Sequence, residues 1–138
     1  MKRVLLIEDD EAIRLPFGEI LRRGGYDVVT AADGRQGMVL FNEQVIDLVI
    51  TDLFMPKQDG AETITAIRRL DPEFKIIAIS GGGQIVRPEY LEPIVASLGV
   101  KHFLKKPFTG SEFLKVVSEV LCGSPLSPGS SVSSEDPS

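Results

Sequence analysis

Polar side chains that could take part in chemistry follow several short apolar runs, each at the point where its run ends. They are Glu8, Asp9, Asp10, Asp52, Ser80, Lys105 and Lys106. In an open parallel sheet, ligands bind outside the carboxyl ends of the strands. If each run is a strand of such a sheet, three of the four carboxylates, the hydroxyl and one of the two lysines converge on one rim. Taken alone, Asp10 fits a helix cap and Ser80 a loop hydroxyl, so the functional interpretation depends on the convergence.

The three carboxylates Glu8, Asp9 and Asp52 would repel one another at close range unless a cation lay among them. Mg²⁺, with Mn²⁺ as an alternative, prefers oxygen ligands and takes one or two carboxylates together with a phosphate oxygen. Such an ion beside a free carboxylate suits phosphoryl transfer, in which positioning and charge neutralisation provide most of the catalysis. The carboxylate itself can be the nucleophile and form an aspartyl phosphate. Lys106 would then offer its charge to the phosphoryl oxygens.

The elements that position these residues follow from the alternation of short apolar runs with helical patterns. The runs span residues 3–7, 27–31, 47–51, 75–80 and 102–104. This alternation predicts an α/β fold with a parallel sheet. Three runs are nearly continuous in Val, Ile and Leu, as expected of central strands covered on both faces. The runs at 27–31 and 102–104 are the expected edge strands.

Two helices have clear sequence signals. The first has the apolar stripe Ile13, Phe17, Ile20 and Leu21, and the last has Phe113, Val116, Val117, Val120 and Leu121. Asp10 is expected to cap the first helix, which should end at the glycines 24 and 25. Pro16 should bend that helix or delay its regular start. Thr109 and Glu112 form a capping-box pattern before the last stripe.

The size and composition of the chain indicate one globular domain followed by a tail. The chain has 138 residues, of which 43% are hydrophobic and 25% charged, enough for one domain with its own core. We expect that domain to span residues 1–122. Residues 123–138 are mostly Ser, Pro and Gly, which predicts a disordered tail or linker. The tail either ends a protein that acts alone by docking or begins a linker cut from a longer chain.

Charge and cysteine content argue against several functional classes. A net charge of −5 disfavours direct binding to nucleic acid, which requires clustered Lys and Arg. The single cysteine, Cys122, cannot form an internal disulfide, so a reducing compartment is expected. The apolar run near the N-terminus is too short for a signal peptide or a membrane span. We therefore expect a cytoplasmic protein whose partners are neither nucleic acid nor membrane.

The stretches "IEDD", "ITDLFMP" followed by "DG", "AIS" and "KKPF" together resemble the receiver domain of bacterial two-component response regulators. The resemblance covers residues 2 to about 121, and this set of motifs is highly specific. It implies a flavodoxin-like doubly wound sheet of five parallel strands in the order 2-1-3-4-5, with five helices.

The resemblance also implies a metal site and a phosphoacceptor. Glu8 and Asp9 match the acidic pair that holds Mg²⁺, and Arg14 helps to fix the register. Asp52 is similar to the phosphoacceptor and shares the metal. The main-chain carbonyl of Phe54 would be a further ligand.

Three further residues match the switching parts of the family. Lys106, rather than Lys105, matches the invariant lysine before proline. Ser80 matches the switch hydroxyl and Phe103 the switch aromatic. Phosphorylation of Asp52 would then alter the binding of an unknown output partner at the face made by the fourth helix, fifth strand and fifth helix.

By this resemblance the chain takes its phosphoryl group from a histidine kinase or a histidine phosphotransfer protein. It is expected to be a signalling domain rather than an enzyme, catalysing only its own phosphotransfer and slow autodephosphorylation. Phe54 stands where a polar residue is common in the family. Its ring would either shield the phosphoryl group from water, or pack on the glycine loop or serve a partner interface. The loop after Ser80, with glycines at 81–83, also looks longer than is usual. The glycines fit either a flexible loop or, less well, an anion-binding nest.

Two alternatives compete with this interpretation. A haloacid-dehalogenase-type enzyme also uses an aspartyl phosphate and Mg²⁺. The pattern of that class at its nucleophile is D-x-D, and here Phe54 stands in place of the second acid. A module that keeps only the fold is the other alternative. The intact set of Glu8, Asp9, Asp52, Ser80 and Lys106 speaks against it.

Overall fold

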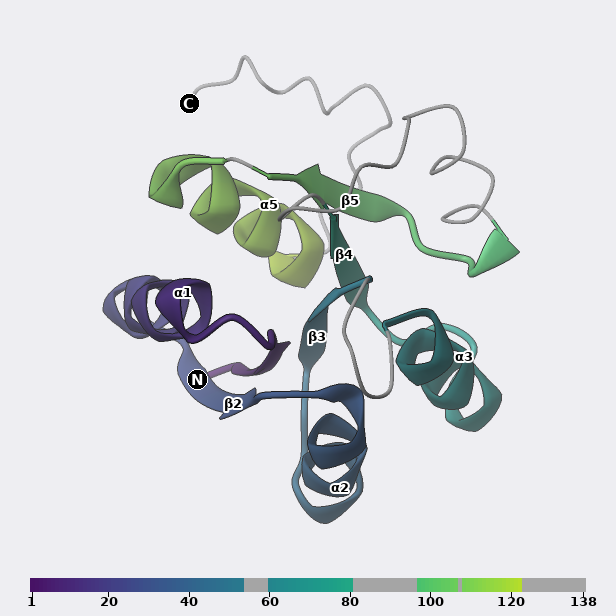
Figure 1. Cartoon of the computed structure of the whole chain (residues 1–138). Coiled ribbons are helices and arrows are strands. Elements are labelled where there is room, and N and C mark those ends of the chain that lie inside the picture. The colour runs from purple at the N-terminus through teal and green to yellow at the C-terminus, as the bar shows by residue number, and fades with distance from the viewer. Residues whose placement is uncertain (54–59, 81–96, 107, 123–138) are drawn as a thin grey trace.

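The computed structural model describes residues 1–53, 60–80, 97–106 and 108–122 (Figure 1). Strands and helices alternate along this part of the chain, as the sequence pattern predicts. In chain order they are β1 (Arg3–Ile7), α1 (Glu11–Arg23), β2 (Asp27–Ala31), α2 (Gly34–Glu43), β3 (Leu48–Asp52), α3 (Gly60–Leu70), β4 (Ile76–Ser80), β5 (His102–Lys105) and α5 (Gly110–Cys122). The predicted fourth helix, expected to begin near Pro88, lies outside the described residues.

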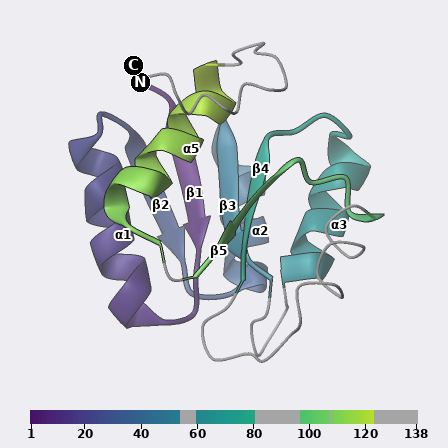
Figure 2. The same ribbon diagram turned by 90° about the horizontal axis from the view of Figure 1, so that it is seen from above.

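The five strands form one parallel sheet in the order β2-β1-β3-β4-β5. The predicted flavodoxin-like order is therefore confirmed, and β2 and β5 are the edge strands. Helices α1 and α5 cover one face of the sheet, and α2 and α3 cover the other (Figure 1). The same two helical layers flank the strands in Figure 2.

The sheet separates two apolar clusters because successive strand residues point to opposite faces. In β1, Leu5 and Ile7 pack on the side of α2 and α3, whereas Val4 and Leu6 pack on the side of α1 and α5. All four side chains are buried. Burying a side chain of this size stabilises the fold by roughly 1.5–3 kcal/mol. Central strands covered on both faces therefore have continuous apolar sequences.

The helix ends agree with most of the local signals in the sequence. The side chain of Asp10 accepts a hydrogen bond from the amide of Ala12 and caps α1. Glu112 and Thr109 form both hydrogen bonds of the capping box. The predicted delay at Pro16 is wrong, because α1 begins at Glu11, directly after its cap.

The end of β3 differs by one residue from the apolar run. The run ends at Thr51, whereas the strand continues through Asp52, which lies opposite Ile79 of β4. The backbone ladder to β4 extends the strand past the last apolar side chain. The carboxylate of Asp52 is thus attached to the sheet itself.

No helix within the described ranges is long and apolar enough to span a lipid bilayer.

Candidate functional site

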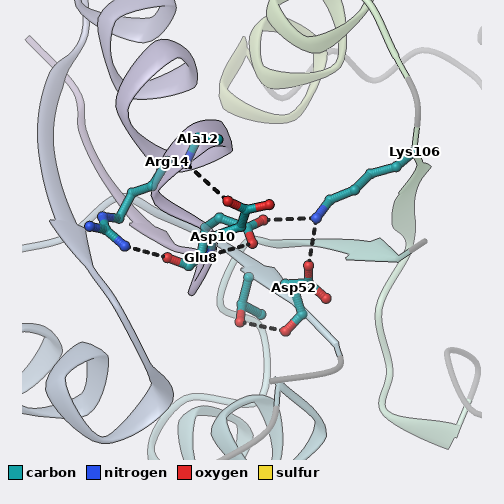
Figure 3. Close-up of polar contacts among 7 residues, drawn as sticks. Glu8, Asp10, Ala12, Arg14, Asp52 and Lys106 are labelled. Atoms are coloured by element: carbon teal, nitrogen blue, oxygen red, sulfur yellow. Dashed lines mark hydrogen bonds and ion pairs between the residues drawn. The ribbon is translucent and has the colours of Figure 1, made fainter. Parts of the chain in front are cut away.

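The site lies at the carboxyl ends of β1, β3 and β5, where the sequence places its polar residues (Figure 3). Glu8 follows β1, Asp52 ends β3, and Lys106 follows β5. The Nζ atom of Lys106 lies 3.1 Å from Oε1 of Glu8 and 2.8 Å from Oδ2 of Asp52. One lysine therefore bridges two acids from neighbouring strands.

Three carboxylates meet at this point. One oxygen each from Glu8, Asp9 and Asp52 lies within 4.8 Å of the other two. Glu8 and Asp52 are buried, with exposed fractions of 1% and 4%, while Asp9 is exposed and leaves the cluster open to solvent on one side. Three acids and one bridging lysine leave an excess of negative charge. A set of carboxylate oxygens with this charge fits Mg²⁺, which prefers oxygen ligands and retains several waters.

The pKa of Glu8 reflects this crowding. Burial raises it to about 7, and the charge of Asp52 acts in the same direction. The amide of Asp10 and the charge of Lys106 lower the pKa of Glu8, but by less. Burial of Glu8 therefore destabilises its charged form by more than Lys106 stabilises it. The cluster thus favours additional positive charge.

Lys106 stays protonated at this position. Burial alone lowers its pKa, but the hydrogen bond and charge of Asp52, together with those of Glu8, raise the pKa above the ordinary value for lysine. The side chain of Lys106 is only 10% exposed, so solvent screens its charge weakly. It is a fixed cation held beside the carboxylate of Asp52. Lys105, the preceding residue, is exposed.

The start of α1 holds Glu8 in place. The amide of Asp10 donates to Oε2 of Glu8 at 3.1 Å, and Nη1 of Arg14 donates to the main-chain carbonyl of Glu8 at 3.0 Å (Figure 3). Asp10 itself acts as the helix cap. These bonds fix both the backbone and the carboxylate of Glu8, so the acid has a defined orientation towards Asp52.

The remaining predicted residues lie in β4, in β5 or outside the described residues. Ser80 ends β4, where its backbone lies opposite Lys105 in the register. Phe103 lies in β5 opposite Ala78 and is partly buried against the core on the α2 and α3 side. Phe54 and the glycines at 81–83 lie outside the described residues.

Two features of the site were not foreseen from the sequence. The hydroxyl of Thr51 donates to the main-chain oxygen of Asp52 at 3.0 Å, and Gly60 packs against that same oxygen. A threonine at the end of an apolar run shows only that the residue suits a strand. A glycine after "ITDLFMP" is typical of a turn, which does not indicate what Gly60 contacts. Neither contact has a signal in the sequence.

Known proteins match this chain over nearly all of the described residues. A model of the response regulator receiver domain matches residues 4–118. The chemotaxis protein CheY of Thermotoga maritima is 34% identical over 120 residues, which cover 86% of this chain and 97% of that protein. The transcriptional regulatory protein CpxR of Escherichia coli is 31% identical over 121 residues. That match covers 88% of this chain but 50% of CpxR, so this chain spans about half of that relative.

Solved structures show the same fold. The chemotaxis response regulator CheY4 of Vibrio cholerae superposes with a TM-score of 0.79 at 30% identity, covering 88% of this chain and 99% of that one. The response regulator TrrA of Thermotoga maritima, solved in complex with Mg²⁺ and BeF, has a TM-score of 0.76 at 29% identity. That match covers 88% of this chain and 100% of TrrA. From the family match over residues 4–118, the sheet order and these relatives, we conclude that the chain belongs to the response regulator receiver domain family of two-component systems.

Proposed function

We propose that this receiver domain is a phosphorylation-dependent switch in which Asp52 accepts a phosphoryl group. The donor is the phosphohistidine of a histidine kinase or of a histidine phosphotransfer protein. The observation that supports this most strongly is the buried carboxylate of Asp52, which lies 2.8 Å from Nζ of Lys106 within a cluster of three acids.

The transfer balances without any further reactant. A carboxylate oxygen of Asp52 forms a bond to phosphorus as the bond from phosphorus to the imidazole nitrogen of the donor breaks. The electron pair of the broken bond stays on that nitrogen. The ammonium group of Lys106 stays charged and pairs with the phosphoryl oxygens once they are attached to Asp52.

Glu8, Asp9 and Asp52 would hold Mg²⁺, together with the main-chain carbonyl of Phe54, and Mn²⁺ is the alternative ion. The solved complex of TrrA with Mg²⁺ and BeF supports this choice, since it places the same ion in a related receiver domain. When bound, the ion neutralises charge on the phosphoryl oxygens. The contacts to the backbone and carboxylate of Glu8 keep one ligand in place before the ion arrives.

The readout of the switch would pass through Ser80 and Phe103. In this proposal the hydroxyl of Ser80 moves to donate to the new phosphoryl oxygens, and Phe103 turns into the space that is left. Phe103 is already partly buried and has no hydroxyl to hold it at the surface. Its inward state would depend on burial alone.

The output partner would bind at the face formed by the fourth helix, β5 and α5. Between β5 and α5 lies a hollow of about 410 Å³ with apolar and charged residues in its lining. These include Leu104, Lys105, Phe108, Lys115, Val116 and Glu119. Such a mixture fits a protein partner, because apolar area gives affinity and charge gives specificity.

Several broader expectations belong to the same proposal. In this proposal the domain spans residues 1–122, and the expected tail at 123–138 lies outside the described residues. It turns over no external substrate and catalyses only its own phosphorylation and slow dephosphorylation. It works in the cytoplasm, where its histidine-phosphorylated donors would meet it, and it contacts neither nucleic acid nor membrane directly.

The experiment that tests the proposal measures incorporation of radioactive phosphate from labelled acetyl phosphate. We expect label that is sensitive to base and to hydroxylamine on the wild-type chain in Mg²⁺, and none in EDTA or in Asp52→Asn. Lys106→Ala should lose most of the label. Lys105→Ala is the matched control, because it removes an exposed lysine next to the site and should label as the wild type does. Label that persists in Asp52→Asn would show that another residue is the acceptor.

A further inference from the structure

Besides its pairing with β4, the backbone of Asp52 makes two further contacts that involve no reactive group. The first comes from Thr51, the residue before the phosphoacceptor, whose side chain has no exposed surface. Its Oγ1 donates to the main-chain oxygen of Asp52 at 3.0 Å. The ladder between β1 and β3 ends at the pair of Ile7 and Thr51, so this hydroxyl acts where that ladder stops.

The second contact comes from Gly60, the first residue of α3. A Cβ atom at position 60 would overlap the main-chain oxygen of Asp52, and it would lie 2.7 Å from Cα of Leu53. The amide of Gly60 donates to the carbonyl of Leu53 at 3.0 Å. Both obstructing groups are backbone atoms, which cannot rotate away as a side chain can. Only glycine lets the start of α3 lie directly on the end of β3.

The two contacts meet on one atom, the main-chain oxygen of Asp52. We propose that Thr51 and Gly60 are positioning residues that fix the peptide of Asp52 and so hold its carboxylate in line for phosphoryl transfer. The proposal assumes that Asp52 is the phosphoacceptor. A small misplacement of a reacting group lowers rates strongly, whereas the fold tolerates it. The residues act through Asp52 and do not touch the phosphoryl group.

The alternative is that Thr51 only fills space in the core, as a β-branched residue commonly does in a strand. Two substitutions separate these roles. Thr51→Val keeps the shape of the side chain and removes the hydroxyl, whereas Thr51→Ser keeps the hydroxyl and removes the methyl group. If Thr51 only packs, the serine variant is the more damaged. If the hydroxyl positions Asp52, the valine variant is.

The test is the rate of phosphorylation by acetyl phosphate at saturating Mg²⁺, with thermal unfolding measured on the same samples. We expect Thr51→Val to react about tenfold more slowly than the wild type, and Thr51→Ser to react within about twofold of it. We expect the serine variant to melt at the lower temperature, because it loses a buried methyl group. A valine variant that reacts at the wild-type rate, or a serine variant that is slowed as much, would overturn the proposal.

Gly60→Ala gives a second test if Thr51→Val does not fold. Its matched control is Gly110→Ala, because Gly110 is also the first residue of a helix, α5. The three heavy atoms nearest to a Cβ at Gly110 belong to the side chain of Ile20, with Cδ1 at 3.1 Å. We expect Gly60→Ala to be slowed at least tenfold and Gly110→Ala to stay within about twofold of the wild type. Equal rates for the two alanine variants would contradict a role for Gly60 in positioning.

The outcome also separates this proposal from the proposed function. If the wild-type chain takes no label, or Asp52→Asn keeps it, the assignment of Asp52 fails. If the wild type is labelled at Asp52 and the variants of Thr51 and Gly60 are labelled at the wild-type rate, only the positioning role fails.

Discussion

At the scale of single residues, the chemistry of the site depends on the balance between its carboxylates and the positive charges beside them. Lys106 contacts both Glu8 and Asp52, and both acids are almost completely buried. A buried ion pair gains little net energy, but removing one partner leaves a charge without compensation and costs about 3–5 kcal/mol. Among the described residues the two acids share this lysine, so losing it would remove a cation from both. A divalent cation adjacent to Asp9 would supply the missing charge.

His102 allows a direct test of the local electrostatics outside the metal cluster. It is the only histidine of the chain, and burial lowers its pKa below 6.5. Lys101 lowers the pKa further, whereas Glu119 of α5 raises it. Because the folded-state pKa lies below the unfolded value, the stability contributed by His102 is present above pH 6.5. It is lost as the pH falls through the folded-state pKa.

We expect proton NMR titration of the single imidazole to give a pKa below 6.5. Lys101→Gln should raise this pKa, and Glu119→Gln should lower it further. His102→Gln should flatten the loss of stability on acidification in the same pH range. An imidazole pKa at or above 6.5 in the folded protein would show that burial does not dominate at this position.

At the scale of elements, strand register assembles the site. Ile7 of β1 lies opposite Thr51 of β3, so the next residues, Glu8 and Asp52, emerge side by side. Ser80 of β4 lies opposite Lys105 of β5, which places Lys106 one residue beyond the ladder. A shift of one residue in either register would turn a site residue to the other face. The apolar faces of the strands prevent that shift, because it would expose core side chains to water.

The start of α5 is a second element that can be tested alone. The hydroxyl of Thr109 accepts from the amide of Glu112 at 3.0 Å, and the Glu112 carboxylate accepts from the amide of Thr109 at 2.8 Å. We expect Thr109→Ala to destabilise the domain by about 1 kcal/mol in urea unfolding, and Thr109→Ser to retain most of that stability.

Thr65→Ala provides the matched control for the cap. Thr65 is exposed in the interior of α3, where its hydroxyl donates to the carbonyl of Ala61. Alanine has the higher helix propensity, so this variant should be neutral or more stable by up to about 0.5 kcal/mol. The same loss of stability in Thr65→Ala and Thr109→Ala would mean that the cap contributes nothing specific.

At the scale of the whole molecule, the acids and the lysine lie on one rim of the sheet. This rim is formed by the carboxyl ends of β1, β3 and β5 and by the start of α1. The match covers nearly all of CheY but about half of CpxR, so a receiver of this size occurs both alone and joined to other sequence. Under the proposed function, the rim would couple in either setting to the partner-binding face. Phosphorylation can do so only by stabilising one arrangement of the domain over another.

Binding of Mg²⁺ should therefore be visible in the stability of the whole domain. An ion that binds only the folded state at ten times its Kd adds about 1.4 kcal/mol of stability, which raises Tm by several degrees. We expect this rise for the wild type in MgCl₂, compared with NaCl of equal ionic strength. Asp52→Asn removes one carboxylate of the cluster and should show a smaller rise. Equal shifts in the two proteins would indicate that Asp52 does not help to bind the ion.

Local sequence patterns predicted much of this protein. The five strands, both ends of α1, the cap of α5 and the acids at the strand ends all follow from signals within a few residues of one another. The end of β3 was missed by one residue, because the pairing of Asp52 with Ile79 depends on a distant strand and not on apolar pattern. The motifs also identified the family, since its reactive residues stand at fixed places after the strands.

Only the tertiary structure decided which groups meet. Lys106 reaches Glu8 across 98 residues of sequence and Asp52 across 54, and no local pattern specifies that one lysine serves both. The contacts of Thr51 and Gly60 on the Asp52 backbone depend on how the start of α3 lies against the end of β3. Their cause is the close packing of backbone on backbone, which leaves no periodic trace in the sequence because it concerns the position of main-chain atoms and not the polarity of side chains.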